Sequence, residues 1–194
     1  MARLRDISID RESILRTAFV LLDEAGLDGI TMRALAARLS VQAPALYWHV
    51  RDKGALLAMM ADDIYARGRR DLDACTDARG WLLQLGRGLA QVLAAQRDAA
   101  RLLAVAGPAR QAEDERAGAM AAAMAGALRQ FGFDLEMALE AQAAVLSLTV
   151  GWALYRENAA MADFLARMFD LDASYAKGLE VLVDGLVARA VHQH

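Results

Sequence analysis

A short stretch near the N-terminus combines the side-chain types with which proteins contact nucleic acids. Residues 42–53 carry an amide, two adjacent aromatic rings, an imidazole and two cations, namely Gln42, Tyr47, Trp48, His49, Arg51 and Lys53. A glutamine amide can read base edges, and the other groups can contact phosphates, sugars or thymine methyl groups. Upstream, Thr31 and Arg33 suit a phosphate contact at the start of a helix. The pattern indicates binding to double-stranded DNA.

Core packing is a second interpretation of the aromatic pair. Tyr47 and Trp48 are adjacent, however, so they cannot both face one core. For His49 the alternative is an ordinary surface or capping histidine, because its assignment depends on its neighbours. We therefore expect at least one of the two rings to contact DNA.

Two short helices joined by a tight turn are predicted to position these side chains. A preceding helix begins after Asp10, a good N-cap residue, and ends at Gly26. Thr31 caps the first short helix, and the second covers residues 42–49 with Pro44 in its first turn, where proline is tolerated. The residues expected to pack inward in this helix-turn-helix are Leu35, Leu39 and Leu46.

Charge is divided unevenly along the chain. The net charge of −3 argues by itself against a basic protein that coats nucleic acid. Residues 29–53, however, contain four cations and one acid, Asp52, for a local charge of +3. Residues 56–194 contain 14 Lys or Arg and 18 Asp or Glu, for a charge of −4. The asymmetry fits a basic DNA-binding unit attached to an acidic one.

The remainder of the chain is predicted to be helical. It is rich in alanine, the whole sequence has only 2 prolines, and apolar residues recur at helical spacing. Longer helices are expected near 79–96, 97–106, 110–131, 134–157 and 173–191. The separators are Gly107-Pro108, the corner 131–134, and residues 158–172. The predicted fold is all-α, with an N-terminal three-helix helix-turn-helix DNA-binding domain at residues 1–55 and a larger helical ligand-binding and dimerisation domain at residues 56–194.

Several other classes of protein are excluded or disfavoured. The single cysteine, Cys75, excludes an internal disulfide framework and a cysteine-rich zinc site. The N-terminus lacks the apolar stretch of a signal peptide. The longest uncharged run, residues 141–155, spans 15 residues, fewer than the roughly 20 that a membrane-spanning helix needs. A soluble cytoplasmic protein without a membrane partner is expected. His192 and His194 lie in the terminal tail, and we assign no metal site.

The sequence resembles the TetR family of bacterial repressors, and its tetracycline repressor subgroup most of all, in the segments LDGITMRALA (27–36), VQAPALYWHV (41–50) and KGALL (53–57). The likeness is strong over residues 10–60, with weaker echoes at 96–98 and 131–136. It implies an all-α homodimer in which three N-terminal helices bind DNA, a fourth links them to the core, and C-terminal helices hold a ligand pocket. The DNA-contacting residues are then Thr31, Arg33, Gln42, Ala43, Pro44, Tyr47, Trp48, His49 and Lys53.

Departures from the family pattern change what can be expected of the site. Ser40 stands where many members have a turn glycine, which predicts slight strain. Met32 and Ala45 replace hydroxyl residues of the subgroup, so the operator sequence should differ. Leu103 and Ala106 replace a histidine and a threonine that help to hold the subgroup's magnesium–drug complex, and Arg69 replaces another ligand-contacting histidine. Neither tetracycline nor magnesium is therefore expected, and no cofactor is assigned.

Candidate pocket residues come from apolar stripes and a few polar groups between them. Flexible methionines suit a pocket for a small hydrophobic effector, although core packing is the more frequent explanation of such stripes. On one face of the 134–157 helix, polar groups could orient a ligand or join two helices. The candidates are Met60, Ile64, Leu85, Leu103, Met120, Met124, Gln142, Leu146, Thr149 and Trp152.

The leading functional hypothesis is a homodimeric repressor that a small effector releases from its operator DNA. Apolar stripes on the 134–157 and 173–191 helices can form internal core or pair with a second copy as a four-helix bundle. The alternatives are a helical dimeric interaction module that binds no DNA, and an activator without a small-molecule inducer. No P-loop, His-Glu-x-x-His or Gly-x-Ser-x-Gly motif is present, so we do not expect an enzyme.

Overall fold

Helices form every regular element that the structure describes. The computed structural model describes residues 10–106, 122 and 125–191, and this part of the chain contains no strand, which confirms the all-α prediction. The N-terminal helices are α1 (Arg11–Gly29), α2 (Met32–Arg38) and α3 (Ala43–Tyr47). The later ones are α4 (Lys53–Gly68), α5 (Ala78–Ala95), α6 (Ala99–Val105), α8 (Leu135–Glu157), α9 (Ala159–Ala166) and α10 (Leu171–Val191).

Side-chain caps define the first helices at the positions that the sequence predicts. The Asp10 carboxylate accepts a hydrogen bond from the Ser13 amide at 2.7 Å, and the Ser13 hydroxyl accepts one from the Asp10 amide at 3.1 Å. This reciprocal pair satisfies two amides that the start of a helix leaves without partners. At the other end Gly26 adopts a φ of +71°, which interrupts α1. Thr31 caps α2 by accepting from the Ala34 amide at 3.1 Å.

A tight turn between α2 and α3 completes the helix-turn-helix. Ser40 adopts the left-handed conformation, with φ of +57°, and the Val41 amide donates to the Ala36 carbonyl at 3.0 Å. Leu35 and Leu46 are fully buried on either side of the turn. Their burial fixes α3 against the rest of the head, by which we mean residues 10–55.

The Ser40→Gly variant is expected to be more stable than the wild type by about 0.5–1 kcal/mol, because glycine adopts a positive φ without the steric cost that serine bears. Urea denaturation measures the difference. A matched variant, Ala37→Gly, places glycine inside α2 on an exposed position and should be destabilised by a similar amount. If both variants were destabilised alike, Ser40 would not be strained.

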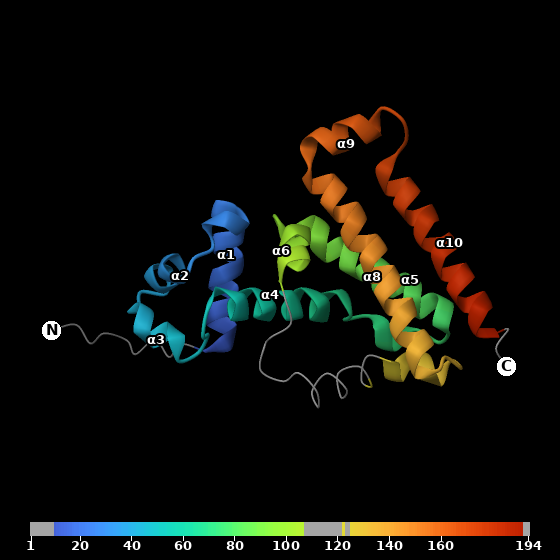
Figure 1. Ribbon diagram of the computed structural model, residues 1–194, viewed down its shortest axis with the longest axis horizontal. Coiled ribbons are helices and arrows are strands. Elements are labelled where there is room, and N and C mark those ends of the chain that lie inside the picture. Colours follow the sequence, from blue (N-terminus) through green and yellow to red (C-terminus); the bar gives the residue numbers. More distant parts are fainter. Residues whose placement is uncertain (1–9, 107–121, 123–124, 192–194) are drawn as a thin grey trace.

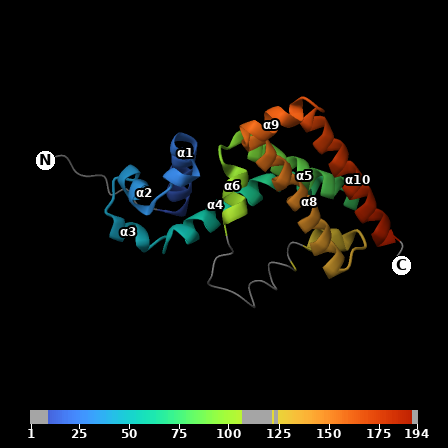
Figure 2. The ribbon, with the colours of Figure 1, turned by 45° about the horizontal axis from the view of Figure 1, so that its top comes forward.

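By the body we mean the described residues from 56 to 191. Its main helices are α5, α8 and α10, and α4 begins in the head and continues along the body to α5 (Figures 1 and 2). Where α4 crosses α5, a Cβ atom added to Gly88 would lie 2.2 Å from the Gly68 carbonyl oxygen. Only glycine therefore allows this close approach. Near the same end of α4, the Arg67 guanidinium lies 4.4 Å from the centre of the Phe19 ring of α1. One apolar core accordingly continues from α1–α4 into α5 and α6.

The region 158–172, predicted as a separator, contains a helix, and that prediction is wrong. The Asn158 side chain accepts from the Met161 amide at 3.1 Å and so caps α9. An Asn in this position ends one helix and starts the next, which the sequence pattern did not distinguish. The corner at 131–134 is confirmed, since Gly132 has a φ of +90° and Asp134 caps α8. Most of the helix predicted at 110–131 lies outside the described residues, although 125–130 are helical.

By length and composition alone, α8 is apolar enough to cross a membrane. In the structure it contacts α5, α6 and α10, and 28% of its most apolar 18-residue window is buried. Ala138, Ala141 and Val145 are buried on one side. Leu146 and Val150, on another side, are only partly covered, and Val181 of α10 is 73% exposed. Both helices therefore keep apolar surface that this chain alone does not cover.

Candidate nucleic-acid interface and cavity

The end of α3 presents two aromatic rings to solvent. Trp48 is 91% exposed and Tyr47 is 49% exposed, whereas the preceding Leu46 is fully buried. The core-packing interpretation therefore does not apply to Trp48. At the start of α3, Gln42 and Pro44 are exposed and Ala43 is partly exposed.

Two basic side chains within residues 31–53 have no acidic partner among the described residues. Arg33 lies on the first turn of α2 and Lys53 on the first turn of α4, and Lys53 is exposed, as are Thr31 and His49. Two neighbouring arginines are already paired: Arg38 with Glu24, and Arg51 with Asp52. The two cations without such a pair are thus available to phosphates.

Asp52 is the acidic residue closest in sequence to Lys53, and it is engaged in capping α4. Its carboxylate accepts from the Ala55 amide at 2.8 Å. That hydrogen bond, followed by the one from Arg51, lowers the pKa of Asp52 below its ordinary value. The carboxylate is therefore ionised at neutral pH and is held by the first turn of α4.

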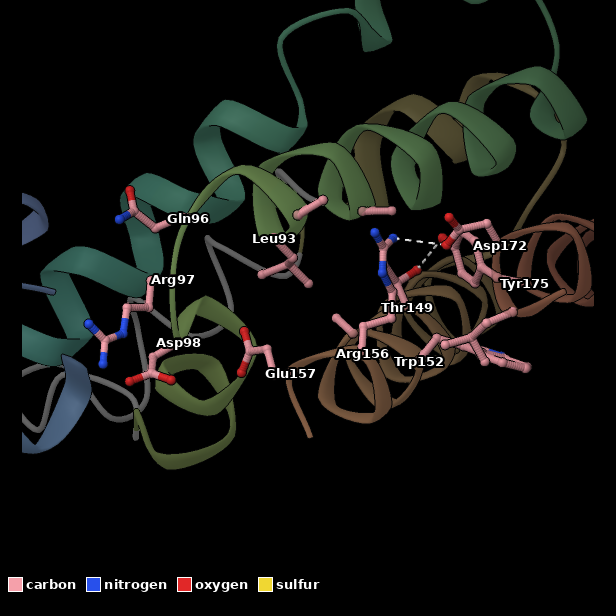
Figure 3. Close-up of a pocket in the computed structure, with 14 residues that line it drawn as sticks. Leu93, Gln96, Arg97, Asp98, Thr149, Trp152, Arg156, Glu157, Asp172 and Tyr175 are labelled. Carbon is pink, nitrogen blue, oxygen red and sulfur yellow. Dashed lines mark hydrogen bonds and ion pairs between the residues drawn. The ribbon is translucent and has the colours of Figure 1, made fainter. Parts of the chain in front are cut away.

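A cavity of about 400 Å³ lies between α5, the C-terminal part of α8 and the start of α10 (Figure 3). On its wall the Thr149 hydroxyl donates to the Val145 carbonyl at 2.8 Å, and its oxygen lies 2.9 Å from the Tyr175 hydroxyl. Because the Thr149 proton is already used, Tyr175 is the donor in that pair, which leaves its oxygen free to accept from a ligand. Burial raises the pKa of Tyr175.

An aromatic cluster and an ion pair form the side of the cavity near α10. The Trp152 ring meets the rings of Tyr155 and Phe169 edge-on, at centroid distances of 6.1 and 6.3 Å. Arg156 of α8 pairs with Asp172 of α10 at 3.1 Å. The wall is thus partly aromatic and partly charged.

On the opposite side, the corner between α5 and α6 lines the cavity and also contacts the head. The Asp98 carboxylate accepts from the Leu27 amide at 2.8 Å, and Arg97 donates to the Asp23 carbonyl at 2.9 Å. Gln96 donates its amide to the Asp23 carboxylate. In Figure 3 the side chains of Gln96 and Arg97 extend away from Trp152. Three consecutive residues therefore connect the cavity to the end of α1.

Glu157 connects α8 to α6 on the same wall. Its carboxylate oxygens accept from the Ala100 amide at 2.8 Å and from the Arg101 amide at 3.2 Å. Burial raises the pKa of this carboxyl above its ordinary value, and the two backbone hydrogen bonds act in the opposite direction.

The sequence-based pocket candidates do not all converge on this cavity. Thr149 and Trp152 line it. Leu103 and Leu146 line a separate groove between α6 and α8. Gln142 donates to the Ala138 carbonyl of its own helix. Met60, Ile64 and Leu85 are buried in the apolar core, and Met120 and Met124 lie outside the described residues.

Several residues that line the cavity were not among the candidates. The polar ones are Gln96, Arg97, Asp98, Arg156, Glu157, Asp172 and Tyr175. Tyr175 belongs to the apolar stripe of the last helix, and Gln96, Arg97 and Asp98 lie in a segment that resembles the family only weakly. The cavity is therefore more polar than the methionine pattern indicates. No group of three or more His, Cys, Asp or Glu in the described part of the chain is placed to hold a metal ion.

Comparison with known proteins places the chain among bacterial regulators. Residues 14–60 match the sequence model of the family described as "Bacterial regulatory proteins, tetR family". The chain is 36% identical to the tetracycline repressor protein class A from transposon 1721 of Escherichia coli, over 91% of this chain and 90% of that protein.

Solved structures agree with that relationship over nearly the whole chain. TetR (class A) in complex with 5a,6-anhydrotetracycline and magnesium superposes with a TM-score of 0.70 and 34% identity, covering 91% of this chain and 96% of the other. A variant of TetR from Acinetobacter baumannii AYE in complex with minocycline gives a TM-score of 0.76 and 32% identity, covering 94% and 98%.

Proposed function

The chain belongs to the TetR family of bacterial regulatory proteins, and we propose that its α3 surface contacts the operator while the Trp152 cavity binds the effector. It is a ligand-responsive DNA-binding repressor that acts as a homodimer. The residues that carry these roles, the domain division at 55/56 and the cytoplasmic location are our assignments. We assign no catalytic step to the chain.

The exposure of Trp48 beside Tyr47 is the observation that supports the DNA surface most directly. Two adjacent aromatic side chains, one of them 91% exposed, are typical of a surface that binds a partner. Gln42, Ala43 and Pro44, at the start of α3, then enter the major groove together with the rings and His49. Thr31, Arg33 and Lys53 contact flanking phosphates, because they lie at helix starts.

The partly covered apolar sides of α8 and α10 supply the dimer interface. Paired with their copies, the two helices would form a four-helix bundle on a two-fold axis. The same axis places two α3 helices one DNA turn apart, roughly 34–36 Å.

A magnesium–drug complex, as in the TetR (class A) structure, does not fit the described residues. Leu103 is buried and Ala106 has no donor atom in its side chain. The effector is instead an organic molecule with a hydrophobic body that packs on Trp152 and Leu93 and donates a hydrogen bond to the Tyr175 oxygen.

The α5–α6 corner transmits effector binding to the head. An effector that favours a different position of this corner shifts the two hydrogen bonds that join it to α1, in which Arg97 donates to Asp23 and Asp98 accepts from Leu27. The head then moves with the corner. Three side chains hold the end of α1, and this contact can be either formed or broken. The protein can then have a different operator affinity in each of the two states.

Replacement of Arg97 by alanine is expected to loosen the end of α1, because the guanidinium donates to both the Asp23 and Glu24 carbonyls and alanine cannot. Hydrogen exchange of the amides in residues 23–29 should accelerate by roughly tenfold, about 1.4 kcal/mol of opening free energy. Arg70→Ala is the control, since Arg70 is exposed and makes no ion pair within the described residues. Equal exchange in both variants would exclude this connection.

Fluorescence anisotropy with the full chain and labelled DNA from upstream of its own coding sequence tests the proposed function. We expect saturable binding of two chains per site, weakened by salt and competed poorly by unrelated DNA. Binding that does not distinguish the two DNAs would contradict a specific operator, and no binding at all would favour the interaction module.

A further inference from the structure

The acidic side chains on the cavity wall differ in whether they form an ion pair. Arg156 and Asp172 pair with each other, and Asp98 lies 3.4 Å from Arg101. Glu157 makes no ion pair with any residue that the structure describes. Two backbone amides hold it, and the residue is only partly exposed. Arg101 is a nearby cation that acts on Glu157, but its guanidinium pairs with Asp28 and Asp98. A partly buried carboxylate without an ion pair of its own attracts a positive charge into its cavity.

Aromatic surface lies across the same cavity from this carboxylate. In Figure 3 the Glu157 carboxylate lies at the α6 end of the cavity, and Trp152 and Tyr175 lie together at the other end. An aromatic face attracts cations as well as flat apolar rings. At about 400 Å³ the cavity is within the range of sites for small organic molecules.

From this juxtaposition we propose that the effector is an aromatic cation, whose rings pack on Trp152 and whose positive charge pairs with Glu157. The inference rests on the proposed function of the cavity as the effector site. It adds to that function the charge of the ligand and the residue that recognises it.

The position of Glu157 also provides a route from ligand to head. Its carboxylate accepts hydrogen bonds from the amides of Ala100 and Arg101 in the first turn of α6. Asp98, two residues before Ala100, accepts a hydrogen bond from the Leu27 amide of α1. A cation drawn to Glu157 competes with those amides for the carboxylate oxygens. The first turn of α6 and the contact to α1 are then weakened together.

Three acridines of the same ring size test the charge preference: 9-aminoacridine, a cation near neutral pH, uncharged acridine, and the anion acridine-9-carboxylate. Titration calorimetry uses the full chain without DNA, so that the affinities do not depend on operator binding. We expect 9-aminoacridine to bind at least about tenfold more tightly than acridine, and the carboxylate to bind weakest.

Glu157→Gln should bring the affinity for 9-aminoacridine down to that for acridine and leave acridine binding unchanged, which also reports an intact cavity. Glu136→Gln, the same change at an exposed position of α8, should alter neither. Trp152→Leu should weaken both ligands.

Four outcomes would overturn the proposal. They are equal affinities for the three acridines, tightest binding of the carboxylate, an unchanged preference in Glu157→Gln, and no binding by any of them. None of these outcomes affects operator binding by the free protein, so the proposed function stands or fails separately in the anisotropy experiment.

Discussion

Tyr47→Ala is expected to weaken specific operator binding by roughly 10- to 100-fold, about 1–3 kcal/mol, while binding to unrelated DNA changes little. The physical reason is position: Tyr47 lies at the end of a five-residue helix, directly before the exposed Trp48, and alanine is too short to reach a base edge from there. Lys53→Ala should act differently. Because this variant lacks the phosphate contact, its binding to all DNA sequences should weaken alike. The slope of log affinity against log salt concentration should become smaller by about one.

Tyr155→Ala is the matched control for Tyr47→Ala. Tyr155 is 47% exposed against 49% for Tyr47, but it lies on α8 in the body. Anisotropy at several salt concentrations should give wild-type operator affinity for this variant. Wild-type affinity for both Tyr47→Ala and Lys53→Ala would remove the assigned contact surface.

Gly88→Ala is expected to lower the free energy of unfolding by about 2–3 kcal/mol. Its new Cβ would lie 2.2 Å from the Gly68 carbonyl oxygen, which belongs to the backbone, so α4 and α5 must separate. Because α4 also carries Lys53 and packs against the head, the same separation should weaken operator binding.

Gly80→Ala provides the comparison within the same helix. There the nearest atoms to the new Cβ are side-chain oxygens of Asp77 at 3.5 Å, an ordinary contact. This variant should be unchanged or slightly more stable, because alanine favours a helix. Urea denaturation of both variants measures the difference, and equal stabilities would show that α4 and α5 tolerate separation.

Local rules predicted the head well. Asp10 and Thr31 are caps because their side chains reach amides three residues ahead, which depends only on sequence spacing. The exposure of Trp48 agrees with its adjacency to Tyr47 and with the buried Leu46 before that pair. Ser40 was expected to be strained at the turn, and its positive φ agrees.

The cavity could not be predicted in the same way. Helical periodicity shows that Met60 and Ile64 face a core, but not whether that core contains a space. The pairs Arg156–Asp172 and Glu157–Ala100 join residues 16 and 57 positions apart, and such contacts exist only once helices pack. Gln142 lies seven residues before Thr149, about 10 Å along the helix, beyond the reach of the cavity.

Hydrogen exchange with and without operator DNA tests the central claim most directly, since coupling between two sites is reciprocal and no effector is needed. The account predicts that saturating operator slows exchange at the contact surface, residues 31–53, and also at Leu27, Ala100 and Arg101, where Asp98 and Glu157 accept their hydrogen bonds. Slowed exchange confined to residues 31–53, with the amides at the α5–α6 corner unchanged, would contradict it.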